Sequence, residues 1–108
     1  MLAKKNRASK KDIDFIFKDG KFLTSPNLTF KFILNNNSSI PRISFIVPKT
    51  VSKKAVNRNL LRRHGYAVLK KYINKFPTRL LGVFVFKKYQ ADILIIENEI
   101  KNILDKIN

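Results

Sequence analysis

The sequence predicts a mixed α/β fold with elements in the order α-β-β-α-β-α. A short strand near residues 22–24 extends this order to α-β-β-β-α-β-α. Three segments carry apolar residues at helical spacing, and three shorter segments have strand-like patterns. Hydrophobic residues make up 44% of the 108 residues and include nine Phe, so the chain can build a core and is not a disordered basic tail.

The first predicted helix covers roughly residues 9–19. Ser9 followed by Asp12 is a helix-start pattern, because the acidic side chain lies near the free N–H groups of the first turn. Gly20 would end this helix. The apolar stripe that we expect to face the core consists of Ile13, Ile16 and Phe17.

Two strands are predicted next. Apolar residues at every second position from Leu28 to Leu34 have the period of a strand with one buried face. RISFIV at 42–47 follows a polar NNNSS loop and ends before Pro48, which stops a strand or confines it to an edge. We expect these two strands to form an antiparallel hairpin.

The second half of the chain predicts a long helix, a buried strand and a final helix. The long helix is expected to run from a cap at Ser52 to about Asn74. LLGVFVF at 80–86 is a continuous apolar run, which is typical of a strand covered on both faces. Ile and Leu residues then recur at helical spacing from 93 to 107, after Asp92 as the expected cap.

The charge of the chain is strongly unbalanced, because 23 Lys and Arg face seven Asp and Glu and give a net charge of +16. A compact fold tolerates such self-repulsion more easily when a polyanion neutralises it, so nucleic acid is the leading class of partner. The absence of cysteine excludes disulfides, thiolate zinc sites and cysteine nucleophiles. No segment approaches the roughly 20 apolar residues of a membrane-spanning helix. We therefore expect a cytoplasmic protein without a membrane partner.

The segment 53–71, KKAVNRNLLRRHGYAVLKK, concentrates the cations. At about 100° per residue, a polar arc of roughly 140° is shared by Arg58, Asn59, Arg62, Arg63 and Tyr66. Lys49, Lys53 and Lys54 extend this patch toward the helix N-terminus, where free N–H groups attract anions. Guanidinium forks match phosphate oxygens and stack on bases. A solvated helix face is the alternative, but solubility is normally reached with charges of mixed sign.

The sequence offers no catalytic or metal-binding constellation. His64 is the only histidine and there is no cysteine, so neither a histidine-based metal site nor a histidine pair can form. Asp12, Asp14 and Asp19 belong to one short helix and its end, whereas a two-metal nuclease needs carboxylates that converge from different elements. Helix capping explains these acidic residues better.

The basic helix resembles that of the protein subunit of bacterial ribonuclease P, whose mark is an Arg-Asn-Arg helix. The segment from Ala55 to Arg63, AVNRNLLRR, matches the family pattern except that Leu60 replaces the second Arg. The other segments that are similar to the family, in their order along the chain, are Asn6-Arg7, Phe17-Lys18-Asp19-Gly20, Pro41 to Val47, and Val83 to Lys87. The order and spacing of these segments carry the resemblance.

The resemblance implies one domain over residues 1–108, an α/β sandwich related to ribosomal protein S5 domain 2, with a left-handed βαβ crossover. It implies the catalytic RNA of ribonuclease P and precursor transfer RNA as partners, and no DNA. The RNA would hold the Mg²⁺ ions and perform the hydrolysis that removes the 5′ leader. The polypeptide alone would therefore cut nothing.

Two sets of site residues follow from this resemblance and from the residue chemistry. The residues expected to contact the catalytic RNA are Lys53, Lys54, Arg58, Asn59, Arg62 and Arg63. A cleft between the sheet and the central helix would take the single-stranded leader, with Phe rings as stacking surfaces for unpaired bases. The residues expected in this cleft are Phe15, Phe17, Phe30, Phe32, Lys49 and Lys87. For the Phe residues, packing in the core is the alternative.

Two other functions stay open at this point. A ribosomal or other structural RNA-binding protein would share the charge and the fold but would not need a cleft for single strands. A DNA-binding domain would place the 53–71 helix in a major groove, but the sequence has no evident helix-turn-helix partner for it.

Overall fold

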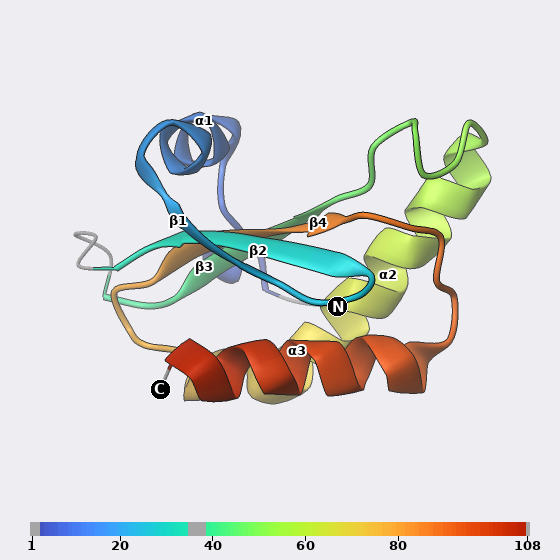
Figure 1. Cartoon of the computed structure of the whole chain (residues 1–108). Helices are drawn as coiled ribbons and strands as arrows, with labels where there is room; N and C mark the ends of the chain where they lie inside the picture. Colours follow the sequence, from blue (N-terminus) through green and yellow to red (C-terminus); the bar gives the residue numbers. More distant parts are fainter. Residues whose placement is uncertain (1–2, 35–38, 108) are drawn as a thin grey trace.

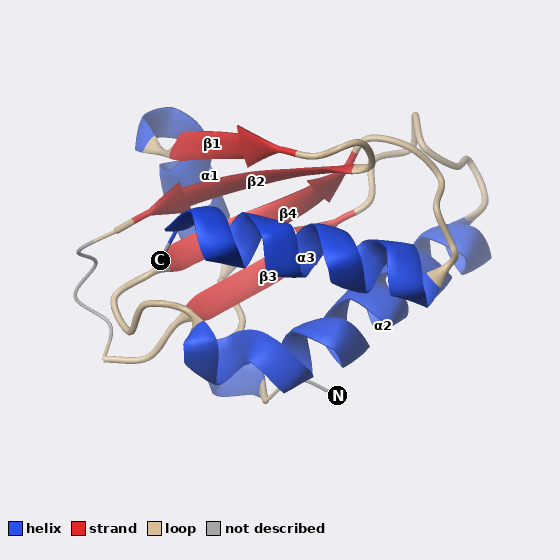
Figure 2. Cartoon of the chain, turned by 60° about the horizontal axis from the view of Figure 1, so that its bottom comes forward, coloured by secondary structure: helices blue, strands red, loops and turns tan. Residues whose placement is uncertain are grey.

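A four-stranded sheet separates two layers of helix in the computed structural model, which describes residues 3–34 and 39–107 (Figure 1). Helix α1 (Lys10–Asp19) covers one face of the sheet. Helices α2 (Ala55–Tyr72) and α3 (Ile93–Ile107) lie on the opposite face and pack against each other (Figure 2). The predicted order α-β-β-β-α-β-α is confirmed.

The sheet has a mixed topology. Its spatial order is β1 (Lys21–Thr24), β2 (Leu28–Ile33), β4 (Leu81–Phe86) and β3 (Arg42–Ile46). Strand β4 pairs antiparallel with β2 and parallel with β3, so the expected hairpin of β2 and β3 is wrong. The reason is that β4 is apolar on both faces and takes a central position between the two. The crossover from β3 through α2 to β4 is left-handed, as the resemblance implied (Figure 2).

Side-chain caps define the starts of α1 and α3. The N–H of Asp12 donates to Ser9 Oγ at 3.2 Å, and the N–H of Ser9 donates to Asp12 Oδ2 at 2.8 Å, which confirms the predicted pattern as a capping box. In α3, the N–H of Leu94 donates to Asp92 Oδ1 at 3.0 Å, so Asp92 is the cap of this helix.

The start of α2 differs from the prediction. The cap residue is Lys54 and not Ser52, because the Lys54 carbonyl accepts a bond from the N–H of Asn57 at 3.1 Å as the helix begins. Ser52 lies two residues earlier, where its Oγ accepts a bond from Asn57 Nδ2 at 3.3 Å. The helix ends at Tyr72 and continues as a 3-10 turn (Ile73–Lys75), close to the predicted end.

The two faces of the sheet have separate cores. The larger core lies between the sheet and the pair α2 and α3. The smaller core lies under α1 and consists of Ala8, Ile16, Leu81 and Val83. Of the apolar stripe expected in the first helix, Ile16 is buried, Ile13 is partly buried, and Phe17 is exposed. The sheet face beside α1 is therefore only partly covered.

Helix α2 lies close to β3 at Gly65. A Cβ atom on Gly65 would lie 2.5 Å from the Phe45 ring. That ring has little room to move, because Tyr66 packs edge-on against it at 5.1 Å and Phe84 stacks on it at 5.0 Å. The glycine thus allows the central helix to dock on the sheet.

The N-terminal segment 3–9 is attached to the edge strand β3. The Oγ of Ser44 donates to the carbonyl of Ala8 at 2.8 Å, and Nε of Arg42 donates to the carbonyl of Arg7 at 3.3 Å. These bonds hold the backbone of Arg7 beside the sheet edge, from which its side chain reaches α2.

Candidate nucleic-acid interface

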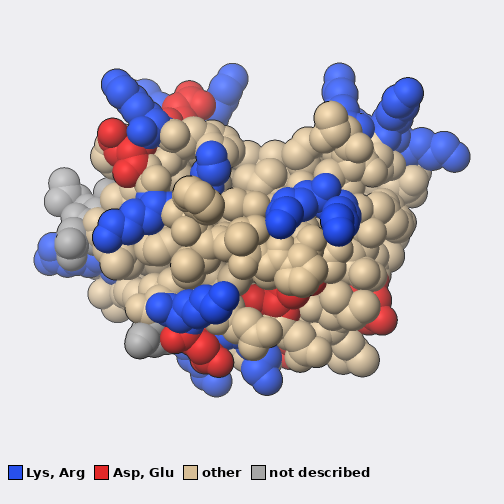
Figure 3. Space-filling model, viewed as in Figure 1, with Lys and Arg blue, Asp and Glu red and all other residues tan. Residues whose placement is uncertain are grey.

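Charges of opposite sign are separated on this molecule. The seven acidic residues lie at positions 12, 14 and 19 in α1 and at 92, 97, 99 and 105 in or beside α3. Residues 20–91 contain none. In Figure 3, acidic atoms gather over α1 and over α3, while Lys and Arg project on both sides of a hollow between α1 and the start of α2. The sheet and α2 therefore carry basic residues and no acidic ones.

A groove of ≈ 800 Å³ lies along α2, and we call it the α2 groove. Three guanidinium groups contribute to its lining, those of Arg7, Arg62 and Arg63. Its other lining residues are Val56, Asn59, Tyr66 and Ala67. Three of the residues expected to contact RNA, Asn59, Arg62 and Arg63, are thus brought together in one concave surface.

Tyr66 is a lining residue of the α2 groove that contacts within the protein hold in place. Its hydroxyl oxygen accepts a hydrogen bond from the backbone N–H of Phe45 at 3.1 Å, which ties the ring to the sheet edge. The guanidinium carbon of Arg7 lies 5.0 Å from the Tyr66 ring centroid, within the range of a cation–π contact. Arg62 donates to Asn59 Oδ1, so these two side chains also orient each other.

Arg7 is a groove residue that the sequence analysis did not include among the site residues. It comes from the N-terminal segment, whereas the other two groove cations, Arg62 and Arg63, come from α2. No helical period therefore connects Arg7 to them. The similarity of Asn6-Arg7 to the opening of the ribonuclease P pattern was the only signal that pointed to this position.

The remaining predicted contacts to the catalytic RNA lie at the start of α2. Lys53 and Lys54 are exposed there. Arg58 does not line the groove, because its Nη1 donates to the carbonyls of Ser52 at 2.9 Å and Lys53 at 2.8 Å. Arg58 therefore stabilises the turn before the helix and keeps its charge beside the two lysines.

A second surface lies on the sheet side that carries α1. We call it the α1 face and define it by Phe15, Phe17, Phe22 and Lys31. Phe15 and Phe17 are 46% and 44% exposed, and Lys31 Nζ lies 4.7 Å from the Phe17 ring centroid. Phe22 pairs with Lys31 in the β1–β2 ladder, so its side chain is on the same face, where it is 66% exposed. Exposed aromatic rings thus flank a cation.

Two of the predicted aromatic contacts to the leader are wrong. Phe30 and Phe32 are 0% and 7% exposed and belong to the core on the opposite face of the sheet. The period of the strand explains this outcome, because positions 28, 30 and 32 share one face whereas Lys31 faces α1. Phe30 stacks on Phe84 at 4.2 Å and has no surface left for a base.

The two lysines predicted for the leader cleft lie on segments that border the sheet. Lys49 is exposed in the loop between β3 and α2. Lys87 follows β4, and its Nζ donates to Thr24 Oγ1 at 2.9 Å and to the Ser25 carbonyl at 3.0 Å. Its ammonium group is therefore held at the end of β1.

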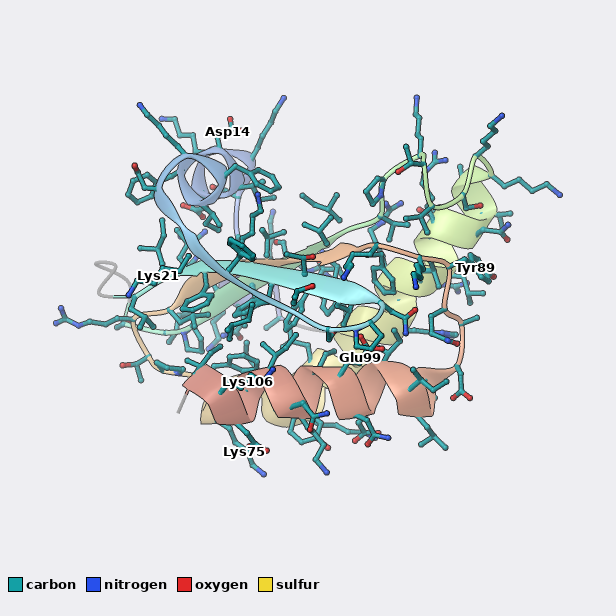
Figure 4. All side chains as sticks on the ribbon, viewed as in Figure 1. Asp14, Lys21, Lys75, Tyr89, Glu99 and Lys106 are labelled. Carbon is teal, nitrogen blue, oxygen red and sulfur yellow. The ribbon has the colours of Figure 1, made fainter. Side chains whose placement is uncertain are left out.

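The acidic residues do not form a metal site in the described ranges 3–34 and 39–107, where no group of three His, Cys, Asp or Glu could hold a metal ion. Asp14 lies on the side of α1 that points away from the sheet, whereas Glu99 points from α3 toward the sheet (Figure 4).

The hydroxyl of Tyr72 donates to Glu97 at 2.5 Å, and this bond raises the pKa of Tyr72 above its ordinary value. Among the described helices, none is long and apolar enough to cross a membrane.

The comparisons with known proteins agree with this geometry. The family model for ribonuclease P matches residues 2–108. The chain belongs to the ribonuclease P protein family. It is therefore a protein component of this endoribonuclease, a ribonucleoprotein of transfer RNA processing. A search of curated proteins found no match.

Solved structures of bacterial ribonuclease P proteins share the fold. The protein from Thermotoga maritima is 23% identical with a TM-score of 0.82, and the match covers 94% of this chain and 97% of that chain. A Staphylococcus aureus ribonuclease P protein mutant with defective mRNA degradation activity is 20% identical with a TM-score of 0.81, over 94% of this chain and 86% of that chain. The predicted fold class is thereby confirmed.

Within this ribonuclease P protein, the departure from the Arg-Asn-Arg pattern lies outside the α2 groove. Leu60 is partly buried and is not one of the residues that line the groove. The loss of a cation at this position therefore does not affect the lining of the groove, where Arg7 adds a third guanidinium group to those of Arg62 and Arg63.

Proposed function

We propose that this ribonuclease P protein binds the catalytic RNA through the α2 surface and holds the single-stranded 5′ leader of precursor transfer RNA on the α1 face. The observation that carries the proposal is the division of the cations between two surfaces of different chemistry. Guanidinium groups gather along α2, and the Lys31 ammonium group lies beside the exposed Phe17 ring on the α1 face.

The α2 surface suits a folded RNA because its donors are planar forks. Arg62 and Arg63 can each present two parallel N–H donors to phosphate oxygens. Lys53 and Lys54 add charge at the helix start, where the free N–H groups of the first turn also attract phosphate. No acidic residue of the same stretch of chain opposes them.

The α1 face suits a single strand because unpaired bases expose their ring faces, whereas a duplex hides them. Phe17 supplies an exposed ring, and Lys31 beside it supplies a charge for the phosphate that connects two bases. Phe15, Lys49 and Lys87 would extend this contact along the strand.

The protein would position RNA and would not cut it. Its carboxylates in the described ranges do not fit a metal site, so the Mg²⁺ ions of hydrolysis would be held by the RNA. The charge of +16 would lower the repulsion between the catalytic RNA and its substrate. Lower repulsion would tighten the binding of both precursor transfer RNA and Mg²⁺.

A reconstitution assay tests this function. The purified protein is mixed with a bacterial ribonuclease P RNA, and cleavage of precursor transfer RNA is followed across a series of Mg²⁺ concentrations. We expect cleavage at low Mg²⁺ where the RNA alone is slow, and no cleavage by the protein alone. Identical Mg²⁺ dependence with and without the protein would overturn the proposal.

A further inference from the structure

We infer that the α2 groove takes the base of an unpaired nucleotide of the catalytic RNA, while the neighbouring phosphates lie on its guanidinium groups. This inference rests on the proposed contact between α2 and RNA and adds the part of the RNA that the groove would recognise. A contact to the backbone of a duplex would use only the cations.

The first argument is the apolar part of the groove. Val56 is 67% exposed on the first turn of the most basic helix, and Ala67 is exposed three turns later. Together with the Tyr66 ring they line the same concave surface as Arg62 and Arg63. Phosphate and ribose gain little from such a surface, whereas a base buries its ring faces on it.

The second argument is the stack that Tyr66 and Arg7 form. The hydrogen bond to the Phe45 N–H and the edge-on contact with the Phe45 ring fix the position of Tyr66. Arg7 lies over the Tyr66 ring at 5.0 Å, and both residues line the groove. Bases stack on aromatic rings and on guanidinium planes, so a fixed pair of both is a suitable platform for one base.

The third argument is size and polarity. The groove volume of ≈ 800 Å³ falls within the roughly 300–1,000 Å³ of sites that enclose small ligands, so a nucleotide fits. Arg62 donates a hydrogen bond to the side-chain oxygen of Asn59. The N–H groups of the same side-chain amide are then available as donors to the edge of a base. The groove therefore combines a stacking platform, a hydrogen-bond donor and cations for the flanking phosphates.

The decisive variant fills the groove without removing a charge. Ala67→Leu adds bulk to the apolar part of the groove, and Ala55→Leu makes the same change at an exposed position of α2 that does not line it. We expect Ala67→Leu to weaken binding to the catalytic RNA by about 5- to 150-fold, the range for loss of one stacked base. The slope of log K against log salt should stay unchanged, because no phosphate contact is lost. Ala55→Leu should bind like the wild type.

A model RNA gives a direct readout. Three hairpins are compared by fluorescence anisotropy: one with a single bulged nucleotide, one with an abasic residue in the bulge, and one fully paired. We expect the wild type to prefer the bulged nucleotide over the abasic residue by about 5-fold or more, and Ala67→Leu to lose this preference. Circular dichroism of each variant checks that it is folded.

The arms of the experiment separate this inference from the proposed function. Equal binding of the bulged and abasic hairpins, together with unchanged binding by Ala67→Leu, would mean that the groove contacts phosphates alone. The inference would then be overturned, while the proposed function would stand if the double variant Arg62→Ala, Arg63→Ala loses affinity and salt slope. If the double variant binds the catalytic RNA like the wild type, α2 is not the RNA surface and both proposals are wrong.

Discussion

The α2 groove and the α1 face carry the same sign of charge but hold it in different ways. In the groove, guanidinium groups are oriented by contacts within the protein, as Arg7 is by Tyr66 and Arg62 is by Asn59. On the α1 face, a lysine lies beside exposed Phe rings of a helix and an edge strand. Under the proposed function, the oriented guanidinium groups would suit a folded RNA, and the exposed rings beside a lysine would suit a flexible single strand.

The two surfaces also depend on different internal contacts. The groove depends on the close approach of α2 to β3 at Gly65. The edge of the sheet beside the α1 face depends on the turn between β1 and β2, which α3 holds through Glu99. Changes at these two positions should therefore damage the two surfaces unequally.

Glu99→Ala should have the largest effect on stability. The buried Glu99 carboxylate accepts bonds from the Asn27 N–H at 2.8 Å, from the Asn27 side-chain amide at 2.6 Å and from the Ser25 hydroxyl. Its removal leaves the two Asn27 donors without this acceptor, while the Ser25 hydroxyl can still donate to the Leu28 carbonyl at 3.1 Å. The free energy of unfolding should therefore fall by about 2–5 kcal/mol. Urea unfolding measures this loss, and Asp105→Ala, at an exposed position of the same helix, is the control.

The functional readout of Glu99→Ala sharpens the comparison. Because Lys87 is bound to Thr24 and Ser25 at the same turn, preference for substrate with a leader over mature transfer RNA should fall more than affinity for the catalytic RNA. A loss of both in equal measure would show that the two surfaces do not depend on separate contacts.

Gly65→Ala should affect the groove instead. The added Cβ would lie 2.5 Å from the packed Phe45 ring, so the free energy of unfolding should fall by about 1–3 kcal/mol. Displacement of α2 would also stretch the bond between Tyr66 and the Phe45 N–H, so affinity for the catalytic RNA should fall while leader preference is kept. A second change, Phe45→Leu, makes room for the methyl group and should restore part of the stability. No recovery in the double variant would rule out a steric cause.

The exposed rings of the α1 face can be ranked by their surroundings. Phe17→Ala should lower the preference for leader-containing substrate by about 1–3 kcal/mol, the range for one stacked base, because the ring lies beside Lys31. Phe22→Ala should have a smaller effect in the same direction, since this ring stands on the edge strand. Competition between precursor and mature transfer RNA for the reconstituted enzyme measures both. If Phe22→Ala weakened only the binding to the catalytic RNA and left leader preference unchanged, the assignment of this ring to the leader surface would be wrong.

Two arginines of α2 should have different roles, Arg62 in RNA binding and Arg58 in stability. Arg62→Ala should reduce the slope of log K against log salt for the catalytic RNA by about 0.7–0.9, as expected for one lost phosphate contact. Arg58→Ala should instead lower the free energy of unfolding by about 1 kcal/mol, because Arg58 binds the Ser52 and Lys53 carbonyls. A salt series and urea unfolding of both variants separate the two roles, and equal slopes for both would contradict the distinction.

Local patterns in the sequence predicted the elements better than their partners. The capping box at Ser9, the strand period from Leu28 and the polar arc of α2 depend on neighbouring residues, and each has a counterpart in the structure. Strand order depends on which strand is buried on both faces, and that strand takes a central position. The continuous apolar run of β4 indicated such a strand, but a hairpin of β2 and β3 was expected instead.

Residues that meet across long distances in sequence were the hardest to predict. Phe30 and Phe32 were expected at the leader surface because their strand has two faces and the sequence does not say which face is fully covered. Arg7 and Phe22 were missed because their neighbours, Tyr66 and Lys31, come from other elements. Side-chain chemistry predicted the kind of partner. Which side chains share a surface became clear only from the way the helices and strands pack together.

The smallest effect is expected at Tyr72, which belongs to neither surface. Its hydroxyl, at the end of α2, donates a hydrogen bond to the Glu97 carboxylate on α3. This bond raises the pKa of Tyr72 above 10.0 in the folded protein. A raised folded-state pKa contributes stability that is fully present below the unfolded-state value and is lost as pH rises through the folded-state value. The wild type should therefore lose a little more stability than Tyr72→Phe as pH rises above 10, measured by thermal unfolding of the protein without RNA. Parallel pH profiles would show that the bond adds no stability, and at neutral pH both proteins should bind the catalytic RNA and select leader-containing substrate equally.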